Sequence, residues 1–95
     1  MPPLPNVMRY VVAADAACAS LEGGAVLLHM GTKRYYSLNE TGALVWQLLE
    51  EGATEGDVVR RLVDRYMVAA GEAGAAVAVL LAELLAEGLV AVHEC

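Results

Sequence analysis

The stretch RYYSLNETGALVWQLL (residues 34–49) passes directly from a strand pattern into a helix pattern. Its first half alternates as a strand does, and we expect Tyr36 and Leu38 to face the core. Asn39 follows as a helix N-cap, because its side chain can accept a hydrogen bond from the free amides of a first turn. Leucine and valine then recur at helical spacing, with Trp46 on the flank of that face. A sharp corner between a strand and a helix is therefore the best-specified feature of the chain.

The bulk composition describes a small domain with an aliphatic core. The 95 residues are 58% apolar and 19% charged and contain no Phe, which fits one globular domain spanning 1–95. The first seven residues are rich in proline and predict a loose arm. They lack the basic start and apolar core of a signal peptide, and the apolar run 73–82 is too short to span a membrane. We therefore expect a cytoplasmic protein.

Upstream of the corner, turn residues predict further strands. Two apolar runs, 17–22 and 25–30, flank a Gly-Gly pair at 23–24 that can take the positive φ angles of a primed hairpin turn. A second turn at Gly31 and Thr32 leads into the strand 33–38. The pattern predicts a three-stranded antiparallel sheet at about 15–38. A weaker strand pattern covers 7–14, and 89–93 reads as a short final strand or an extended tail.

Downstream of the corner, capping residues divide the chain into helices. Gly52 closes the first helix, and Thr54 with Asp57 resembles a capping box that opens the second. Gly88 ends the third. We expect helices at about 40–51, 54–68 and 72–87. A small sheet followed by three helices is an α+β arrangement of the winged helix-turn-helix kind.

The sequence shows no convincing catalytic or metal-binding pattern. Neither His29 nor His93 has a second ligand at a metal spacing, so we expect His29 to be a satisfied, partly buried side chain and no metal to bind. Cys18 paired with His29 would need a group to orient the histidine, and none is evident. No glycine-rich loop carries the Lys-Ser/Thr of a nucleotide site. We expect no cofactor and no enzymatic activity; a small enzyme acting through Cys18 is the weaker alternative.

Two surfaces remain unexplained by a self-contained fold. The third helix is apolar almost all round, so it is either central in the domain or partly reserved for a partner. The strand 33–38 ends the predicted meander and can form a sheet edge. Its Lys33 and Arg34 can protect that edge from stray pairing, but the same edge can accept a guest strand. The residues alone leave both questions open.

Together these segments resemble a known family. The resemblance is carried by AVLLHMGTKRYYSLNETGALVWQLLEEGATEGDVVRRLVDRY (residues 25–66) and AVAVLLAELLAEGLV (residues 76–90). These segments are similar to the peptide-binding domains related to pyrroloquinoline-quinone biosynthesis protein D, which are also called RiPP precursor recognition elements. Within that family the chain looks most like the stand-alone, leader-binding half of a split lasso-peptide B protein.

The resemblance implies a non-catalytic winged helix-turn-helix domain. Such a domain binds the leader of a ribosomally made precursor peptide, here of the lasso type, and presents it to a separate leader peptidase, a cysteine protease. The leader adds as a strand beside the third strand and lies against the third helix. Carried over, the implied contact residues are Lys33, Arg34, Tyr35, Tyr36, Ser37, Leu38, Ala76, Val77, Leu80, Glu83 and Leu84. Many relatives carry an acidic residue where this chain has Ala76, so Glu83 is the carboxylate left near that wall.

Two further functions stay open at this point. A winged-helix DNA-binding regulator would need a basic recognition helix, and the best candidate carries Arg60, Arg61 and Arg65 beside two aspartates. The net charge of −6, with only six Lys and Arg residues, argues against a phosphate-binding face. Within the resembled family, the leader could instead be escorted to a radical-SAM enzyme. The sequence does not separate that role from delivery to a peptidase.

Overall fold

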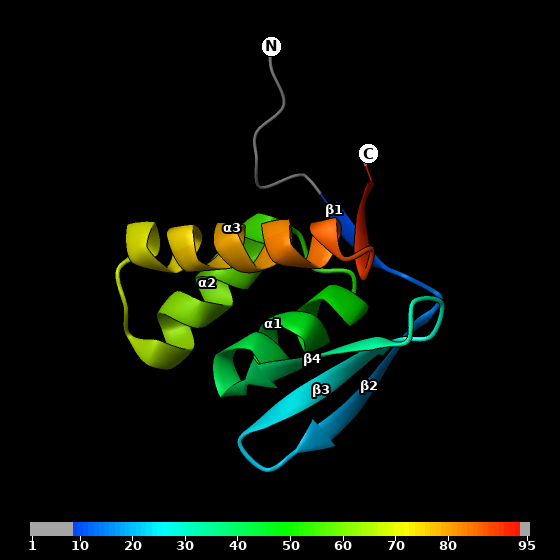
Figure 1. Ribbon diagram of the computed structural model, residues 1–95. Coiled ribbons are helices and arrows are strands. Elements are labelled where there is room, and N and C mark those ends of the chain that lie inside the picture. The colour runs from blue at the N-terminus through cyan, green and yellow to red at the C-terminus, as the bar shows by residue number, and fades with distance from the viewer. Residues whose placement is uncertain (1–8, 94–95) are drawn as a thin grey trace.

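The computed structural model describes residues 9–93, and the arm expected at residues 1–7 lies outside them. The predicted α+β architecture is confirmed, because an antiparallel sheet in the order β2-β3-β4 precedes three helices in a winged helix-turn-helix arrangement (Figure 1). The strands are β1 (Arg9–Val12), β2 (Ala16–Leu21), β3 (Gly24–His29), β4 (Arg34–Asn39) and β5 (Val90–His93). The helices are α1 (Glu40–Glu50), α2 (Glu55–Tyr66) and α3 (Ala70–Ala86).

The two weak strand patterns at the ends of the chain form a second sheet. β1 and β5 pair antiparallel, with Tyr10 opposite Val92, and the Ala13 amide extends the contact by donating to the Leu89 carbonyl at 2.8 Å. The sequence indicated both segments but gave no sign that they meet. Because β5 follows α3 directly, this pairing fixes the C-terminal end of α3, where Leu89 is fully buried.

The first predicted turn was placed one residue off, whereas the second lies where it was expected but ends one residue later. Leu21 pairs with Gly24, so the first loop is Glu22-Gly23, and of these only Gly23 has a positive φ, 81°. The turn is therefore not the primed type expected. Gly24 belongs to β3, where an added Cβ would collide with the Leu38 carbonyl. In the second turn Lys33 takes a positive φ of 65°, so β4 begins at Arg34.

The predicted caps of α1 and α2 are confirmed. Asn39 Oδ1 accepts a hydrogen bond from the Gly42 amide at 2.8 Å. Thr54 and Asp57 form the reciprocal capping box. The Asp57 amide donates to Thr54 Oγ1 at 3.1 Å, and the Thr54 amide donates to Asp57 Oδ2 at 3.2 Å. Hydrogen bonding from the Thr54 backbone amide, and then from the Thr54 side chain, lowers the pKa of the Asp57 carboxyl, because it favours the charged form. α3 begins at Ala70, two residues before the expected start, and has no side-chain cap.

The core lies between the inner face of the β2-β3-β4 sheet and the helices. Its largest fully enclosed side chains include Trp46, Leu27 and Leu81. The expectation that Trp46 lies on the flank of its helix was wrong, because α1 contacts β1, β3, β4 and α2 and so buries more than one face. None of the helices within residues 9–93 is long and apolar enough to cross a membrane.

Candidate functional site

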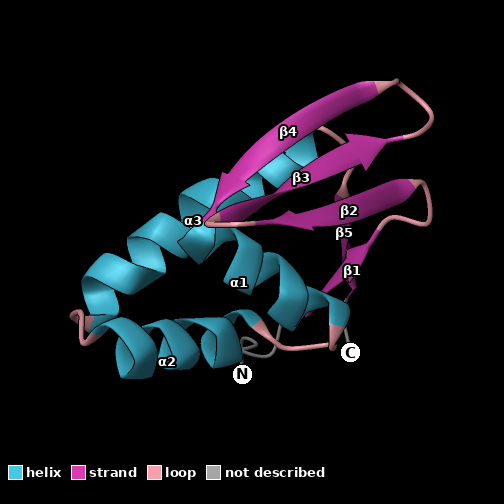
Figure 2. Cartoon of the chain, turned by 90° about the horizontal axis from the view of Figure 1, so that it is seen from below, coloured by secondary structure: helices cyan, strands magenta, loops and turns pink. Residues whose placement is uncertain are grey.

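β4 is an outer strand of the three-stranded sheet, and among residues 9–93 no strand pairs with its outer side (Figure 2). The Met30 amide donates to the Asp15 carbonyl at 2.8 Å, which marks this as the hydrogen-bonded type of antiparallel pair. Hydrogen bonding alternates from residue to residue along each ladder. Because this alternation continues through the register of β2, β3 and β4, Tyr35 and Ser37 direct their backbone N–H and C=O groups away from β3. These backbone groups are available to an incoming strand.

A hollow of about 280 Å³ lies along this strand, between β4, the first turn of α1 and α3. We call it the β4–α3 groove. It is lined by Tyr36, Ser37, Leu38, Asn39, Thr41, Gly42, Ala76, Leu80, Glu83, Leu84 and Leu89. Leucine side chains dominate this lining, and a groove of this kind favours apolar side chains of an extended segment.

The structure brings most of the expected contact residues into this groove. Those that line it are Tyr36, Ser37, Leu38, Ala76, Leu80, Glu83 and Leu84. The remaining four lie elsewhere. Lys33 is in the turn before β4, Tyr35 is 71% exposed on the opposite face of the sheet from Tyr36, and Val77 is 1% exposed in the core beneath the groove. Arg34 lies beyond the lining, where it meets Glu87.

Sequence reasoning missed the contribution of α1 to the groove. Asn39, Thr41 and Gly42 line it because the helix starts directly at the end of β4. An added Cβ at Gly42 would lie 3.3 Å from the Leu38 side chain, so glycine lets this turn approach the strand closely. The N-cap at Asn39 was the signal that could have placed this turn against the strand.

One end of the groove is charged. Arg34 Nη1 lies 3.6 Å from Glu87 Oε1, and this ion pair joins β4 to the residue that caps the C-terminus of α3. A hydrogen bond to Glu87 raises the pKa of the Tyr36 hydroxyl, and partial burial raises it further. Glu83 also faces this end, and within residues 9–93 no ion pair involves it. The end is therefore predominantly acidic.

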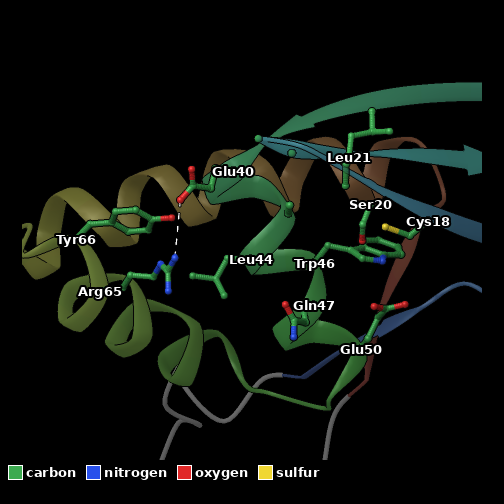
Figure 3. A pocket seen from close by; sticks show the side chains of 14 residues that line it. Cys18, Ser20, Leu21, Glu40, Leu44, Trp46, Gln47, Glu50, Arg65 and Tyr66 are labelled. Atoms are coloured by element: carbon green, nitrogen blue, oxygen red, sulfur yellow. Dashed lines mark ion pairs between the residues drawn. The ribbon is translucent and has the colours of Figure 1, made fainter.

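A larger hollow of about 690 Å³ lies beside the edge strand β2, at the opposite edge of the sheet from the β4–α3 groove (Figure 3). We call it the β2 hollow; its lining includes Cys18, Ser20, Glu40, Trp46, Gln47, Glu50, Arg65 and Tyr66. Arg65 Nη2 lies 3.8 Å from Glu40 Oε1. The indole nitrogen of Trp46 and the hydroxyl of Tyr66 are buried there, and no described residue hydrogen-bonds to either. This lining is markedly more polar than that of the β4–α3 groove.

The geometry gives no support to catalysis through Cys18. Partial burial, followed by the nearby Glu50 carboxylate, raises the pKa of the Cys18 thiol, the opposite of what a nucleophile needs. His29 Nδ1 accepts hydrogen bonds from the amides of Gly31 and Thr32 at 3.1 and 3.2 Å, as expected of a satisfied histidine. Within residues 9–93 no three His, Cys, Asp or Glu side chains gather as metal ligands.

Comparison with known proteins found one matching family model and two similar solved structures. The family model described as coenzyme PQQ synthesis protein D (PqqD) matches residues 24–90. The structure of TbiB1 in complex with the TbiA(beta) leader peptide is 26% identical, with a TM-score of 0.80, and the match covers 84% of this chain and 93% of that one. A lasso peptide synthetase B1 complexed with the leader peptide is 29% identical, also at 0.80, covering 87% and 98%. No curated protein matches.

Proposed function

The chain belongs to the PqqD family, and from this premise we propose that it binds the leader segment of a ribosomally synthesised precursor peptide. The observation that carries the proposal is an open strand edge beside an apolar groove, in a chain whose solved relatives are leader-peptide complexes. The leader adds as a strand to β4. Its alternate side chains enter the β4–α3 groove, and the others lie beside Tyr35 on the outer face of the sheet.

The apolar lining supplies most of the binding free energy in this proposal. A backbone hydrogen bond contributes about 0.5–1.5 kcal/mol net, because it replaces hydrogen bonds to water. Each leader side chain buried against Leu38, Leu80 or Leu84 contributes roughly 1.5–3 kcal/mol. The strand pairing therefore fixes the register and direction of the leader, while the groove selects its side chains.

The protein serves as a carrier and not as a catalyst in this proposal. It presents the leader, as of a lasso-peptide precursor, to a separate leader peptidase of the cysteine-protease type. Escort to a radical-SAM enzyme is the alternative within the same recognition role. A DNA-binding role is less favoured, because two of the three arginines of the candidate recognition helix form ion pairs. Arg60 pairs with Asp57 and Arg65 pairs with Glu40. Only Arg61 has no acidic partner among the described residues.

The experiment is a fluorescence anisotropy titration with a labelled synthetic leader of a precursor encoded beside this protein's gene. Leu80→Ala removes an apolar wall of the groove, and we expect it to weaken binding about tenfold or more. Val79→Ala is the matched control. Val79 neighbours Leu80 on α3 but is 60% exposed and outside the groove, so its loss should leave the affinity unchanged.

Saturable binding at about 1 μM or tighter that responds to Leu80 and not to Val79 would establish both the role and the site. Absence of binding to the leader of every neighbouring precursor would overturn the proposed role. Equal losses from the two substitutions would place the leader away from the β4–α3 groove. A gel shift with duplex DNA that weakens with added salt would favour the regulator instead.

A further inference from the structure

The β4–α3 groove has one charged side chain in its lining. Leu38, Leu80, Leu84 and Leu89 give it an apolar body, and Glu83 is the only Asp, Glu, Lys or Arg among the described residues that line it. Glu83 lies on the exposed side of α3, one helical turn before Glu87. A guest strand that fills the groove would pass this carboxylate and partly shield it from water.

The charges around Glu83 do not neutralise it. Arg34 is the nearby cation, but its guanidinium already meets Glu87 at 3.6 Å. Glu87 in turn is engaged by Arg34 and the Tyr36 hydroxyl, whereas no ion pair in residues 9–93 involves Glu83. The C-terminal turn of α3 has no basic residue, so the partial negative charge of its last carbonyl groups adds to the same field.

We infer that the groove selects strands carrying a lysine or arginine opposite Glu83, with apolar side chains at the alternate positions that face the leucines. The basic side chain meets Glu83 at the end marked by the Arg34–Glu87 pair, and the apolar ones extend toward Gly42. An acidic residue at the same position would bring two carboxylates together in a partly dehydrated groove, which is unfavourable. Glu83 thereby selects the class of peptide, and it reinforces the strand direction that the backbone pairing fixes. This inference rests on the proposed leader-binding role.

The test is a charge swap measured on leader-derived peptides. Each residue of the leader that binds in the first titration is replaced in turn by Lys, Gln and Glu. The series is titrated against the unaltered protein, Glu83→Lys and Glu83→Gln. At one position we expect Lys to bind about tenfold tighter than Glu at low salt, and this preference should reverse in Glu83→Lys and largely vanish in Glu83→Gln. The difference should shrink in 0.5 M NaCl, because salt screens a partly exposed pair.

Glu72→Lys is the matched control. Glu72 is an exposed acid on the same helix but outside the groove, so the same change in net charge should leave the peptide preference intact. Circular dichroism of each variant confirms that it is folded. If peptides bind through Leu80 but no position reverses in Glu83→Lys, the inference fails while the leader-binding role stands. If no peptide of the series binds the unaltered protein, the role fails and the inference fails with it.

Discussion

The three-stranded sheet has two open edges, β2 and β4. Their charged residues alone would predict the wrong edge as the site for a guest strand. β2 has no charged residue and is exposed from Ala17 to Leu21, so it is the less protected edge. β4 carries Arg34, a residue type that usually discourages strand pairing. On that criterion alone, β2 would be the better place for a guest strand.

What lies behind each edge reverses that ranking. Beside β4, Leu80 and Leu84 of α3 and Leu89 just after it can bury the side chains of a guest. Beside β2 the hollow is larger but contains Glu40, Glu50 and other polar groups that would lose water on binding. An open edge gives a strand hydrogen bonds that are nearly balanced by those lost to water. The comparison indicates that an apolar backing, more than an open backbone, makes an edge a peptide site.

Blocking each edge with proline should give the largest difference between them. Ser37 in β4 and Ser20 in β2 are both exposed, and the register directs both amides away from β3. Proline is tolerated at such edge positions because the sheet does not use that N–H, but it removes the donor and obstructs a new strand. We expect Ser37→Pro to weaken leader binding at least thirtyfold in the anisotropy assay and Ser20→Pro to leave it unchanged.

Thermal unfolding of both proline variants provides the control for folding. Both prolines restrict φ in a strand, so their midpoints should fall by similar amounts. Loss of leader binding in Ser20→Pro with retention in Ser37→Pro would assign the leader to the β2 edge and reverse the comparison. If both variants lose leader binding equally but differ in thermal stability, the loss would reflect misfolding and not the blocking of a strand edge.

The second difference concerns stability and should be smaller. The Tyr66 hydroxyl is buried beside the β2 hollow with no hydrogen-bond partner in the described part of the chain, whereas the Tyr10 hydroxyl donates to Glu55 Oε1 at 3.2 Å. Removing an unpaired buried polar atom relieves a desolvation penalty, while removing a paired one leaves its partner unsatisfied. We expect Tyr66→Phe to raise the free energy of unfolding by up to about 1 kcal/mol and Tyr10→Phe to lower it by about as much.

Urea unfolding followed by circular dichroism measures both tyrosine variants. Leader affinity should be the same in both, since neither side chain lines the β4–α3 groove. A loss of stability in Tyr66→Phe would mean that the hydroxyl is satisfied in solution. The polar groups buried at the β2 hollow would then be hydrogen-bonded in the folded protein and would not weaken it.

How far the sequence predicts this fold depends on the range of the interactions. The Asn39 cap and the Thr54–Asp57 box were predictable, because each lies within one helical turn. The alternation that turns Tyr36 and Leu38 toward the core was equally local, and both pack against it. The pairing of β1 with β5 was not predictable, because it joins segments about 80 residues apart with only weak strand patterns.

The candidate site shows the same difference between local features, which could be predicted, and tertiary contacts, which could not. The family resemblance implied the groove-facing residues of β4 and α3, but it did not separate Leu80, which lines the groove, from Val77, which the core encloses. Lys33 was placed in the strand because nothing in the pattern revealed its left-handed backbone. The first turn of α1 entered the site only through tertiary packing at Gly42.

Cys18 offers the mildest test of the two edges, because its thiol lies on β2 and lines the β2 hollow. Partial burial and the nearby Glu50 carboxylate raise its pKa above the ordinary value of a thiol, so alkylation by iodoacetamide at pH 7 should be slower than that of free cysteine. The rate should climb as the pH rises toward 9, because the thiolate is the reactive form. A saturating leader should leave this rate unchanged within about a factor of two. Replacing Cys95 by serine leaves a single thiol to follow by mass spectrometry. Strong protection of Cys18 by the leader would mean that the guest covers β2, and the polar hollow, not the leucine-lined groove, would then be the peptide site.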